Sequence, residues 1–285
     1  MGKIKIITDS TSDVTLNEAE KYGIEILGQT ILFGDKSYTE TLELSADDFW
    51  VKLKEFGGIP KTSQINITKF TECYEKYKDM QMIYIAISGK SSGTIQSATL
   101  AKNMFLEENP EADITIIDSE KFAYGYGYWV VKAAIMANEG KTKEEIVKAV
   151  TEGLAKTEVL FAVDDLTFLQ KGGRISPAAK IVGNLLDIKP ILSVVDGLIL
   201  NVAKVRGSKK MYAKIAEMML ENGDDLENQT INILHCNNED MIEKMENAIS
   251  AKVNVKGFER RIVGGTVGTN TGPGVIAVTY IKKLS

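Results

Sequence analysis

Short apolar runs rich in isoleucine alternate with amphipathic segments along the first half of the chain. The runs occupy residues 4–7, 82–87 and 114–117, and each is followed by a helical pattern, at residues 17–22, 95–105 and 128–138. Strands with few polar positions are buried on both faces, and helices between them let such strands run parallel. This half of the chain is therefore predicted to form a three-layer α/β domain around a parallel sheet.

One segment in this half departs from the alternation. Residues 33–38 place a Gly-Asp pair between strand-forming residues, which predicts a hairpin turn. Ser45 precedes Asp47 and Asp48, as expected of an N-cap serine before an acidic first helical turn. We expect this hairpin and helix to lie beside the parallel sheet.

The pattern of elements changes near residue 157. The helix predicted over residues 142–156 begins with a capping box of Thr142 and Glu145. Beyond it, a hairpin signal at Asp196-Gly197 and helical patterns over residues 209–220 and 240–250 indicate mixed structure. No low-complexity linker intervenes. We therefore predict two closely packed domains, an N-terminal α/β domain (1–156) and a C-terminal α+β domain (157–285), with the ligand site at their interface.

Composition narrows the class of protein. The 285 residues are 44% hydrophobic and 26% charged, which is ordinary for a globular chain with a sizeable core. A net charge of -5 gives no electrostatic reason to expect nucleic acid as a partner. The N-terminus enters a strand pattern at once, and no apolar run approaches the roughly 20 residues that cross a bilayer. We expect a cytoplasmic protein with no integral membrane contact.

Polar clusters follow the predicted parallel strands. They comprise residues 8–12, residues 88–94 and Asp118-Ser119. Because the carboxyl ends of parallel strands border the ligand crevice, this edge is the expected site. The Ser-Ser-Gly-Thr turn at residues 91–94 leads into a helix, whose first N–H groups suit a phosphate or a carboxylate. The alternative is that Ser91 or Ser92 only caps that helix.

Other candidate groups are less specific. Thr62 and Ser63 either face the cleft or cap the helix expected from Thr68. Arg174 follows a Gly-Gly pair and suits a carboxylate or phosphate through its fork of donors, but it is equally consistent with a solvated helix end. Arg206, in a basic segment before Lys209, either binds an anion or acidic partner or is simply solvated.

Several enzyme classes find no support in the sequence. The turn at residues 91–94 is neither a Walker motif nor a dinucleotide fingerprint. The sole histidine, His235, ends an apolar run. The sequence contains no Gly-x-Ser-x-Gly elbow, so a serine hydrolase that uses this histidine is not indicated. Cys73 and Cys236 lie far apart, and no metal-ligand spacing is present. We expect no metal and no disulfide.

Seven motifs in order give the chain a resemblance to a known family. They are Ile7-Thr8-Asp9-Ser10-Thr11-Ser12-Asp13, Thr62-Ser63-Gln64, Ser92-Gly93-Thr94 with Gln96-Ser97-Ala98, Ile117-Asp118-Ser119, Gly172-Gly173-Arg174-Ile175, residues 183–192, and Thr271-Gly272-Pro273-Gly274. The chain resembles the DegV family, bacterial fatty-acid-binding proteins that include the FakB subunits of fatty acid kinase. The resemblance implies an N-terminal α/β domain and a C-terminal α+β domain with an acyl tunnel.

The resemblance also implies a function and a set of site residues. A protein of this kind holds a long-chain fatty acid and presents its carboxyl group to a separate ATP-dependent kinase, without being catalytic or needing a cofactor. The ligand-binding residues implied are Thr62, Ser63, Ser92, Gly93, Asn270 and Thr271, whereas Arg174 and Arg206 are associated with phosphotransfer and kinase docking. An enzyme acting at the Ser-Gly-Thr turn, or a family member with a changed ligand and no kinase, stays open as an alternative.

Asn270 departs from the family pattern. The family loop usually reads His-Thr-Gly-Pro-Gly, with the histidine reaching the ligand's carboxyl group, and the histidine position here is Asn270. An asparagine amide can donate a hydrogen bond to a carboxylate, but it cannot become positively charged near neutral pH. We expect binding to survive and phosphotransfer to suffer. The alternative is that Asn270 only shapes a glycine-rich turn, since asparagine tolerates left-handed backbone.

Overall fold

The computed structural model describes residues 3–175 and 187–283. Ser176 and residues 183–186 lie outside the described residues, and the latter belong to one of the family motifs. No helix in the described part of the chain is long and apolar enough to cross a bilayer.

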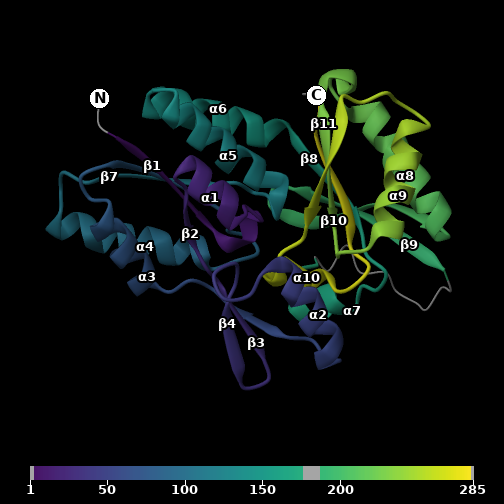
Figure 1. Ribbon diagram of the computed structural model, residues 1–285, viewed down its shortest axis with the longest axis horizontal. Helices are drawn as coiled ribbons and strands as arrows, with labels where there is room; N and C mark the ends of the chain where they lie inside the picture. Colours follow the sequence, from purple (N-terminus) through teal and green to yellow (C-terminus); the bar gives the residue numbers. More distant parts are fainter. Residues whose placement is uncertain (1–2, 176–186, 284–285) are drawn as a thin grey trace.

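A four-stranded parallel sheet forms the centre of the N-terminal half. Its strands are β1 (Ile4–Asp9), β2 (Glu25–Leu27), β6 (Gln81–Ala86) and β7 (Asp113–Asp118), in the order β2-β1-β6-β7. Ile6 and Ile83 pack on α1 (Leu16–Tyr22), α5 (Tyr124–Asn138) and α6 (Lys143–Lys156), whereas Ile7 and Tyr84 pack on α3 (Ile67–Lys76) and α4 (Thr94–Glu108). Helices therefore cover both faces (Figure 1), and the predicted three-layer architecture is confirmed.

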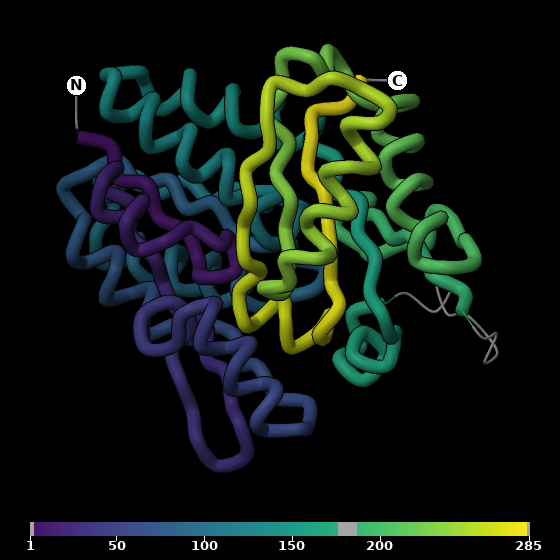
Figure 2. Tube along the Cα trace, turned by 45° about the vertical axis from the view of Figure 1, so that its right-hand side comes forward, coloured from purple at the N-terminus to yellow at the C-terminus, as the bar shows by residue number. Residues whose placement is uncertain are grey.

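The hairpin and helix that were expected beside this sheet are also present. Strands β3 (Thr30–Phe33), β4 (Lys36–Thr39) and β5 (Lys61–Ser63) form a small antiparallel sheet in the order β4-β3-β5, and the β3–β4 hairpin projects from the body of the molecule (Figures 1 and 2). Ser45 caps α2 (Ala46–Phe56), since its Oγ accepts a hydrogen bond from the Asp48 N–H at 3.1 Å.

A second, six-stranded sheet begins at Thr157. Its strands are β8 (Thr157–Ala162), β9 (Ile188–Val195), β10 (Leu198–Arg206), β11 (Thr230–His235), β12 (Gly257–Ile262) and β13 (Ile276–Ile281), in the order β10-β9-β8-β13-β11-β12. All neighbouring pairs are antiparallel except β11 and β12. The Asp196-Gly197 turn joins β9 to β10, as its sequence predicts. The domain boundary at residue 156 stays a prediction.

Alternation along these strands produces two apolar faces. Leu160, Ile233 and Val278 point to α8 (Ser208–Asn222) and α9 (Glu239–Ser250), which cover the outer face. Phe161 and Ala277, one residue out of phase, belong to a different core cluster on the opposite face. That cluster also contains residues of β3, α2 and α5, so the inner face of the second sheet packs on the N-terminal half of the chain.

Buried polar contacts join the two halves where β12 leads into the short helix α10 (Gly265–Thr271). Asp13 Oδ1 accepts a hydrogen bond from the Gly264 N–H at 3.0 Å, and Glu40 accepts one from the Thr266 N–H and one from its hydroxyl, both at 2.6 Å. We call this set of contacts the interdomain clasp.

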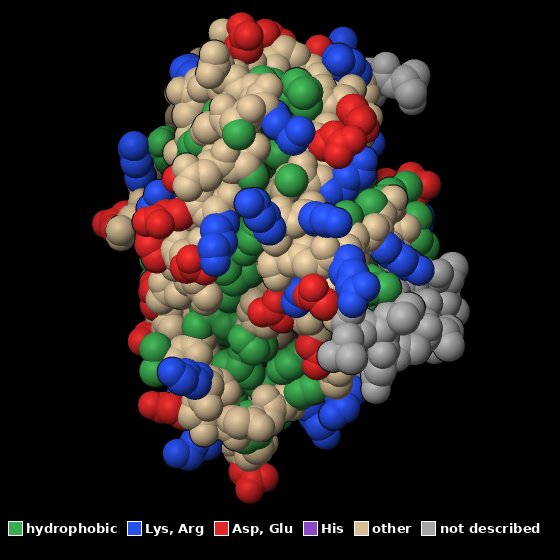
Figure 3. Space-filling model, turned by 90° about the vertical axis from the view of Figure 1, so that its right-hand side faces the viewer, with side chains coloured by type: hydrophobic (Ala, Val, Ile, Leu, Met, Phe, Trp, Pro, Cys, Tyr) green, Lys and Arg blue, Asp and Glu red, His purple; other side chains and the backbone are tan. Residues whose placement is uncertain are grey.

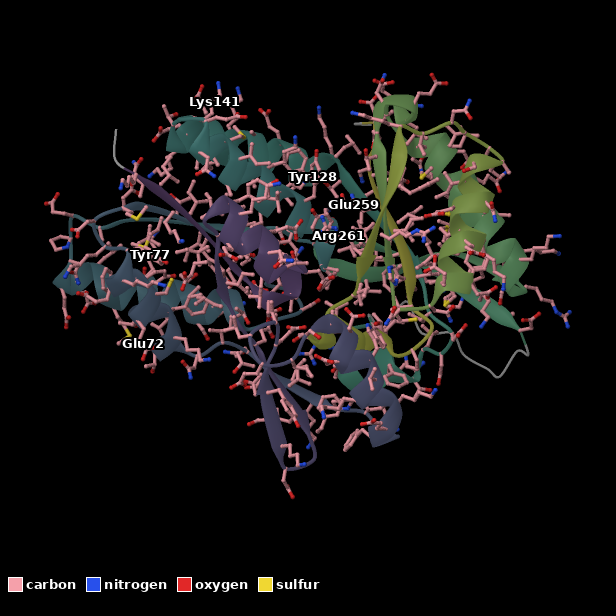
Figure 4. All side chains as sticks on the ribbon, viewed as in Figure 1. Glu72, Tyr77, Tyr128, Lys141, Glu259 and Arg261 are labelled. Carbon is pink, nitrogen blue, oxygen red and sulfur yellow. The ribbon has the colours of Figure 1, made fainter. Side chains whose placement is uncertain are left out.

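The clasp continues into a second contact on the strand side. Arg261 of β12 pairs with Glu18 of α1 at 2.7 Å, and its guanidinium carbon lies 4.0 Å from the centre of the Tyr124 ring. In Figure 4 the labelled Arg261 and Glu259 lie beside Tyr128 of α5, at the junction of the two halves. Arginine suits this place because it combines an ion pair with stacking on an aromatic face.

Asp13 is the energetically costly member of the clasp. Its Oδ2 is buried without a hydrogen-bond partner among the described residues, and its backbone is left-handed with φ 56°. Burial raises the pKa of the Asp13 carboxyl well above its ordinary value, and the neighbouring Glu40 adds to the rise. The folded chain therefore holds this proton more tightly than the unfolded chain does.

The substitution Asp13→Asn should stabilise the protein at neutral and alkaline pH. Because the folded-state pKa lies above the unfolded value of about 3.9, this carboxyl supports stability most at low pH and less as pH rises between the two values. Asparagine keeps the acceptor for Gly264, tolerates the left-handed backbone and carries no charge. Urea unfolding should give an advantage of about 1–3 kcal/mol at pH 8 that shrinks toward pH 4.

The matched control is Asp35→Asn in the exposed hairpin turn. It should leave the unfolding free energy within about 0.5 kcal/mol of the unaltered protein at every pH. A stability advantage of Asp13→Asn over the unaltered protein that is smaller at pH 8 than at pH 5 would contradict the assignment of a raised pKa to this carboxyl.

Candidate functional site

An apolar cavity lies between the inner face of the second sheet and the N-terminal half. Its atom-free volume is about 750 Å³ when the open solvent at the mouth is included. Strands β8, β9, β10, β11 and β13 supply much of its wall. The apolar lining residues are Ile87, Phe122, Ala123, Val159, Phe161, Leu169, Val194, Ile199, Leu234, Val263, Val267, Val275 and Ala277. Most of these residues belong to one core cluster, so the cavity is a hollow in the core.

Polar side chains from five parts of the chain line the same cavity. Five of the residues predicted from the sequence line it: Thr62, Ser92, Arg174, Asn270 and Thr271. Ser63, Gly93 and Arg206 are not among its lining residues. The sequence does not assign a ligand-binding role to three further polar lining residues, Gln29, Ser91 and Thr266. Of these three, only Ser91 stands out in the sequence, as a candidate helix cap.

The turn before α4 carries Ser92 into the site. Gly93 is the N-cap of α4 and makes no side-chain cap. Ser92 Oγ donates to Thr94 Oγ1 at 3.0 Å and accepts from the Thr94 N–H at 3.3 Å, while Ser91 Oγ donates to the Gly197 carbonyl at 3.4 Å. Neither serine satisfies the second or third N–H of the helix, so the N-cap is Gly93, whereas Ser92 accepts from only the first helical N–H.

Gly93 has a packing reason to be glycine. A Cβ at this position would overlap the side-chain oxygen of Gln64, from the Thr-Ser-Gln motif. Gln64 in turn donates to Ser97 Oγ at 2.9 Å. Gly93 therefore allows the two motifs to approach each other without lining the cavity itself.

Thr62 reaches the cavity from strand β5. The alternative role as a helix cap is wrong, because α3 begins at Ile67 and is capped by the Asn66 side chain. Strand alternation places neighbouring side chains on opposite faces, which explains why Thr62 lines the cavity and the exposed Ser63 does not.

Asn270 lies in helix α10 and not in a turn. The left-handed residues of the loop are Gly272 and Gly274, with φ 72° and 97°. The alternative that Asn270 is there to tolerate a left-handed backbone is therefore wrong. Its Nδ2 donates to the Thr266 carbonyl at 2.9 Å, one helical turn back. One amide hydrogen is used inside the helix, and one is left for the cavity.

Arg174 connects the cavity to a broader groove outside it. Its Nε donates to the Ser91 carbonyl at 3.3 Å and its Nη1 to the Gly172 carbonyl, so the exposed guanidinium is tied across the mouth. The groove is also lined by Thr62 and Asn270, together with Lys54, Lys61 and Lys171. Arg206 lies apart from it, exposed at the end of β10. Figure 3 shows hydrophobic side chains gathered across the lower half of one face, beneath a group of Lys and Arg.

Among the described residues, His235 is buried and Cys236 is partly buried. His235 is buried at the end of β11 and accepts a hydrogen bond from the Asn237 N–H at 3.1 Å, and burial lowers the pKa of its imidazole. Burial raises the pKa of the Cys236 thiol at the edge of the groove. Among residues 3–175 and 187–283, no group of three or more His, Cys, Asp or Glu side chains could hold a metal ion.

Comparison with known proteins identifies the family. The model described as "Uncharacterised protein, DegV family" matches residues 3–283. The chain belongs to the DegV family. A DegV domain-containing protein of Caldanaerobacter subterraneus subsp. tengcongensis is 35% identical, over 99% of this chain and 100% of its own length.

Solved DegV structures share the fold of this chain. The Bacillus subtilis DegV structure, described as a fatty acid binding protein, has a TM-score of 0.85 and 30% identity over 99% of this chain and 100% of its own. A DegV family structure from Ruminococcus gnavus, described with vaccenic acid, has a TM-score of 0.87 and 26% identity over 98% of this chain and 100% of its own.

In this DegV chain, Gly172→Ala should disturb the cavity mouth more than the fold. A Cβ at Gly172 would overlap Asn270 Oδ1, so the methyl group must displace the asparagine side chain. Alanine also favours the helical backbone of α7 (Thr167–Gly172), which limits the loss of stability to about 1 kcal/mol or less. A fluorescent apolar probe held in the cavity should dissociate about tenfold faster, as measured by stopped-flow fluorescence.

Gly257→Ala is the matched control, because a Cβ there meets no atom within 4 Å. It should leave ligand release unchanged. Equal release rates for the two variants would show that release from the cavity does not depend on the position of the Asn270 side chain.

Proposed function

We propose that this protein is a carrier that holds a long-chain fatty acid in the apolar cavity and presents its carboxyl group at the mouth. One observation carries the proposal: a hollow in the core has an apolar wall and a polar rim at one side, in a chain whose solved relatives are described as fatty acid binding. The carrier itself is not catalytic.

The cavity suits the two ends of such a ligand differently. Burying a chain of about 14–16 methylenes is worth on the order of 11–13 kcal/mol gross, before ordering costs. A carboxyl group needs hydrogen-bond donors when it leaves water, because an unpaired charge is expensive to bury. The hydroxyl of Thr62 and the amide of Asn270 supply such donors on the cavity lining, and the Ser92 hydroxyl can rotate from Thr94 Oγ1 to donate to the ligand.

The same arrangement supports presentation to a separate ATP-dependent kinase. A carboxylate oxygen of the bound acid attacks the γ-phosphorus of the kinase's ATP, an O–P bond forms, and ADP leaves, which yields an acyl phosphate. Arg174 lies at the mouth with a permanent charge, well suited to orient a phosphoryl group. Arg206, exposed on β10, is proposed to contact the kinase from outside the cavity.

A second candidate is a family member that binds a ligand without a kinase partner. Asn270 favours it, because its amide already donates to Thr266 and cannot supply the charge that a histidine would. Both candidates share the binding step, and only the first includes phosphoryl transfer to the bound acid.

Native mass spectrometry of the protein purified from bacteria tests the binding step. We expect a retained mass equal to one long-chain fatty acid, released on denaturation and identified by its fragmentation. Protein that is empty, that fails to take up added fatty acid, and that turns over ATP unaided would instead indicate an enzyme acting at the Ser-Gly-Thr turn.

The substitution Asn270→His tests presentation. A histidine can carry a positive charge beside the transferring phosphoryl group, where charge builds up in the transition state. We expect fatty-acid retention to stay within about twofold, and acyl phosphate formation with a DegV-type fatty acid kinase to rise about tenfold or more. Equal rates for both forms would contradict the role given to position 270.

A further inference from the structure

Gln29 is a cavity-lining residue, and its side-chain amide nitrogen has no partner among the described residues. The residue directly precedes β3 and is only 3% exposed. Its Nε2 is buried and makes no hydrogen bond to any side chain or backbone group of residues 3–175 and 187–283. Buried donors are almost always paired in native proteins, so an unpaired donor on a residue that lines a cavity points to a group that the cavity receives.

The main chain of Gln29 is held on both sides. Its N–H donates to Ser10 Oγ at 3.0 Å, and its carbonyl accepts from the Glu40 N–H at 2.8 Å. Both anchors are tied to the interdomain clasp, since Ser10 also donates to Glu40. The protein therefore fixes the backbone of Gln29, while the side-chain amide nitrogen has no partner among the described residues.

The position of Gln29 places it on the same side of the cavity as a rim hydroxyl. Ile31 of β3 pairs with Thr62 of β5 in the antiparallel register, so their side chains share one face of the small sheet. Gln29 lies two residues before Ile31 and continues that face. Gln29, Thr62 and Thr266 all line the cavity.

Only one part of a fatty acid can accept a hydrogen bond from this amide. A long-chain acid accepts hydrogen bonds only through its carboxyl oxygens, and an amide buried against methylenes without a partner is unfavourable. We propose that Gln29 is a further ligand-binding residue, whose amide nitrogen donates a hydrogen bond to the carboxyl group of the bound acid. This inference rests on the proposed function.

The substitution Gln29→Leu separates this role from a structural one. Leucine keeps the bulk and removes the orphan donor, so the ligand-free, delipidated variant should melt at or above the temperature of the unaltered protein. Its affinity for palmitate should be about tenfold lower by titration calorimetry. If Gln29 only supported the fold, the substitution would lower both the melting temperature and the affinity for palmitate.

Two more variants sharpen the test. Gln29→Glu replaces the donor with a carboxylate, so palmitate binding should be weaker still at pH 8 and should recover toward pH 5 as a carboxyl takes up a proton. Gln81→Leu is the matched control: it removes an amide paired with Asp113 at the far end of β6 and should leave palmitate affinity unchanged.

The outcomes are distinguishable. If the unaltered protein binds palmitate and Gln29→Leu binds it equally well, the role of Gln29 is overturned and the proposed function stands. If Gln29→Leu melts lower and the binding deficit of Gln29→Glu does not change with pH, Gln29 is structural only. If the unaltered protein binds no palmitate, the proposed function fails, and this inference fails with it.

Discussion

The arrangement of the cavity depends on the hydrogen bonds that the buried Glu40 carboxylate accepts. This carboxylate accepts hydrogen bonds from Ser10 and from both the N–H and the hydroxyl of Thr266, so it joins the end of β1 to the start of α10. Burial raises the pKa of Glu40, whereas the three donors favour its charged form. Because α10 carries Asn270 and Thr271, the position of the cavity rim depends on this buried contact.

The clasp also explains why the two halves of the chain together form one cavity. The apolar wall comes largely from the inner face of the second sheet. The rim comes from Gln29, β5, the turn before α4, Arg174 after α7, and α10. Neither half encloses the cavity alone. An apolar tail gains affinity in proportion to the surface it buries, whereas a few polar groups fix its orientation, so wall and rim can be supplied by different segments.

Sequence patterns predicted the features that are decided locally. The strands, the Ser45 cap, the capping box of Thr142 and Glu145, and the Asp-Gly hairpin were all found where they were expected. Predictions failed where local propensity and tertiary contact compete. Asparagine and glycine suggested a loop over residues 268–274, but residues 268–271 belong to α10, which is stabilised by contacts at its start, and the backbone turns only at Gly272.

Family motifs in the sequence were enough to select Thr62, Ser92, Arg174, Asn270 and Thr271 as candidates, since each belongs to a short pattern with recognisable chemistry. Nothing in the sequence marked Gln29 or Thr266, because burial and pairing are properties of the folded chain. A glutamine before a strand is usually solvated, and only the long-range contacts of Ser10 and Glu40 bury this one beside the cavity. The tertiary structure alone decided which polar groups share the rim, because they come from segments up to 242 residues apart, from Gln29 to Thr271.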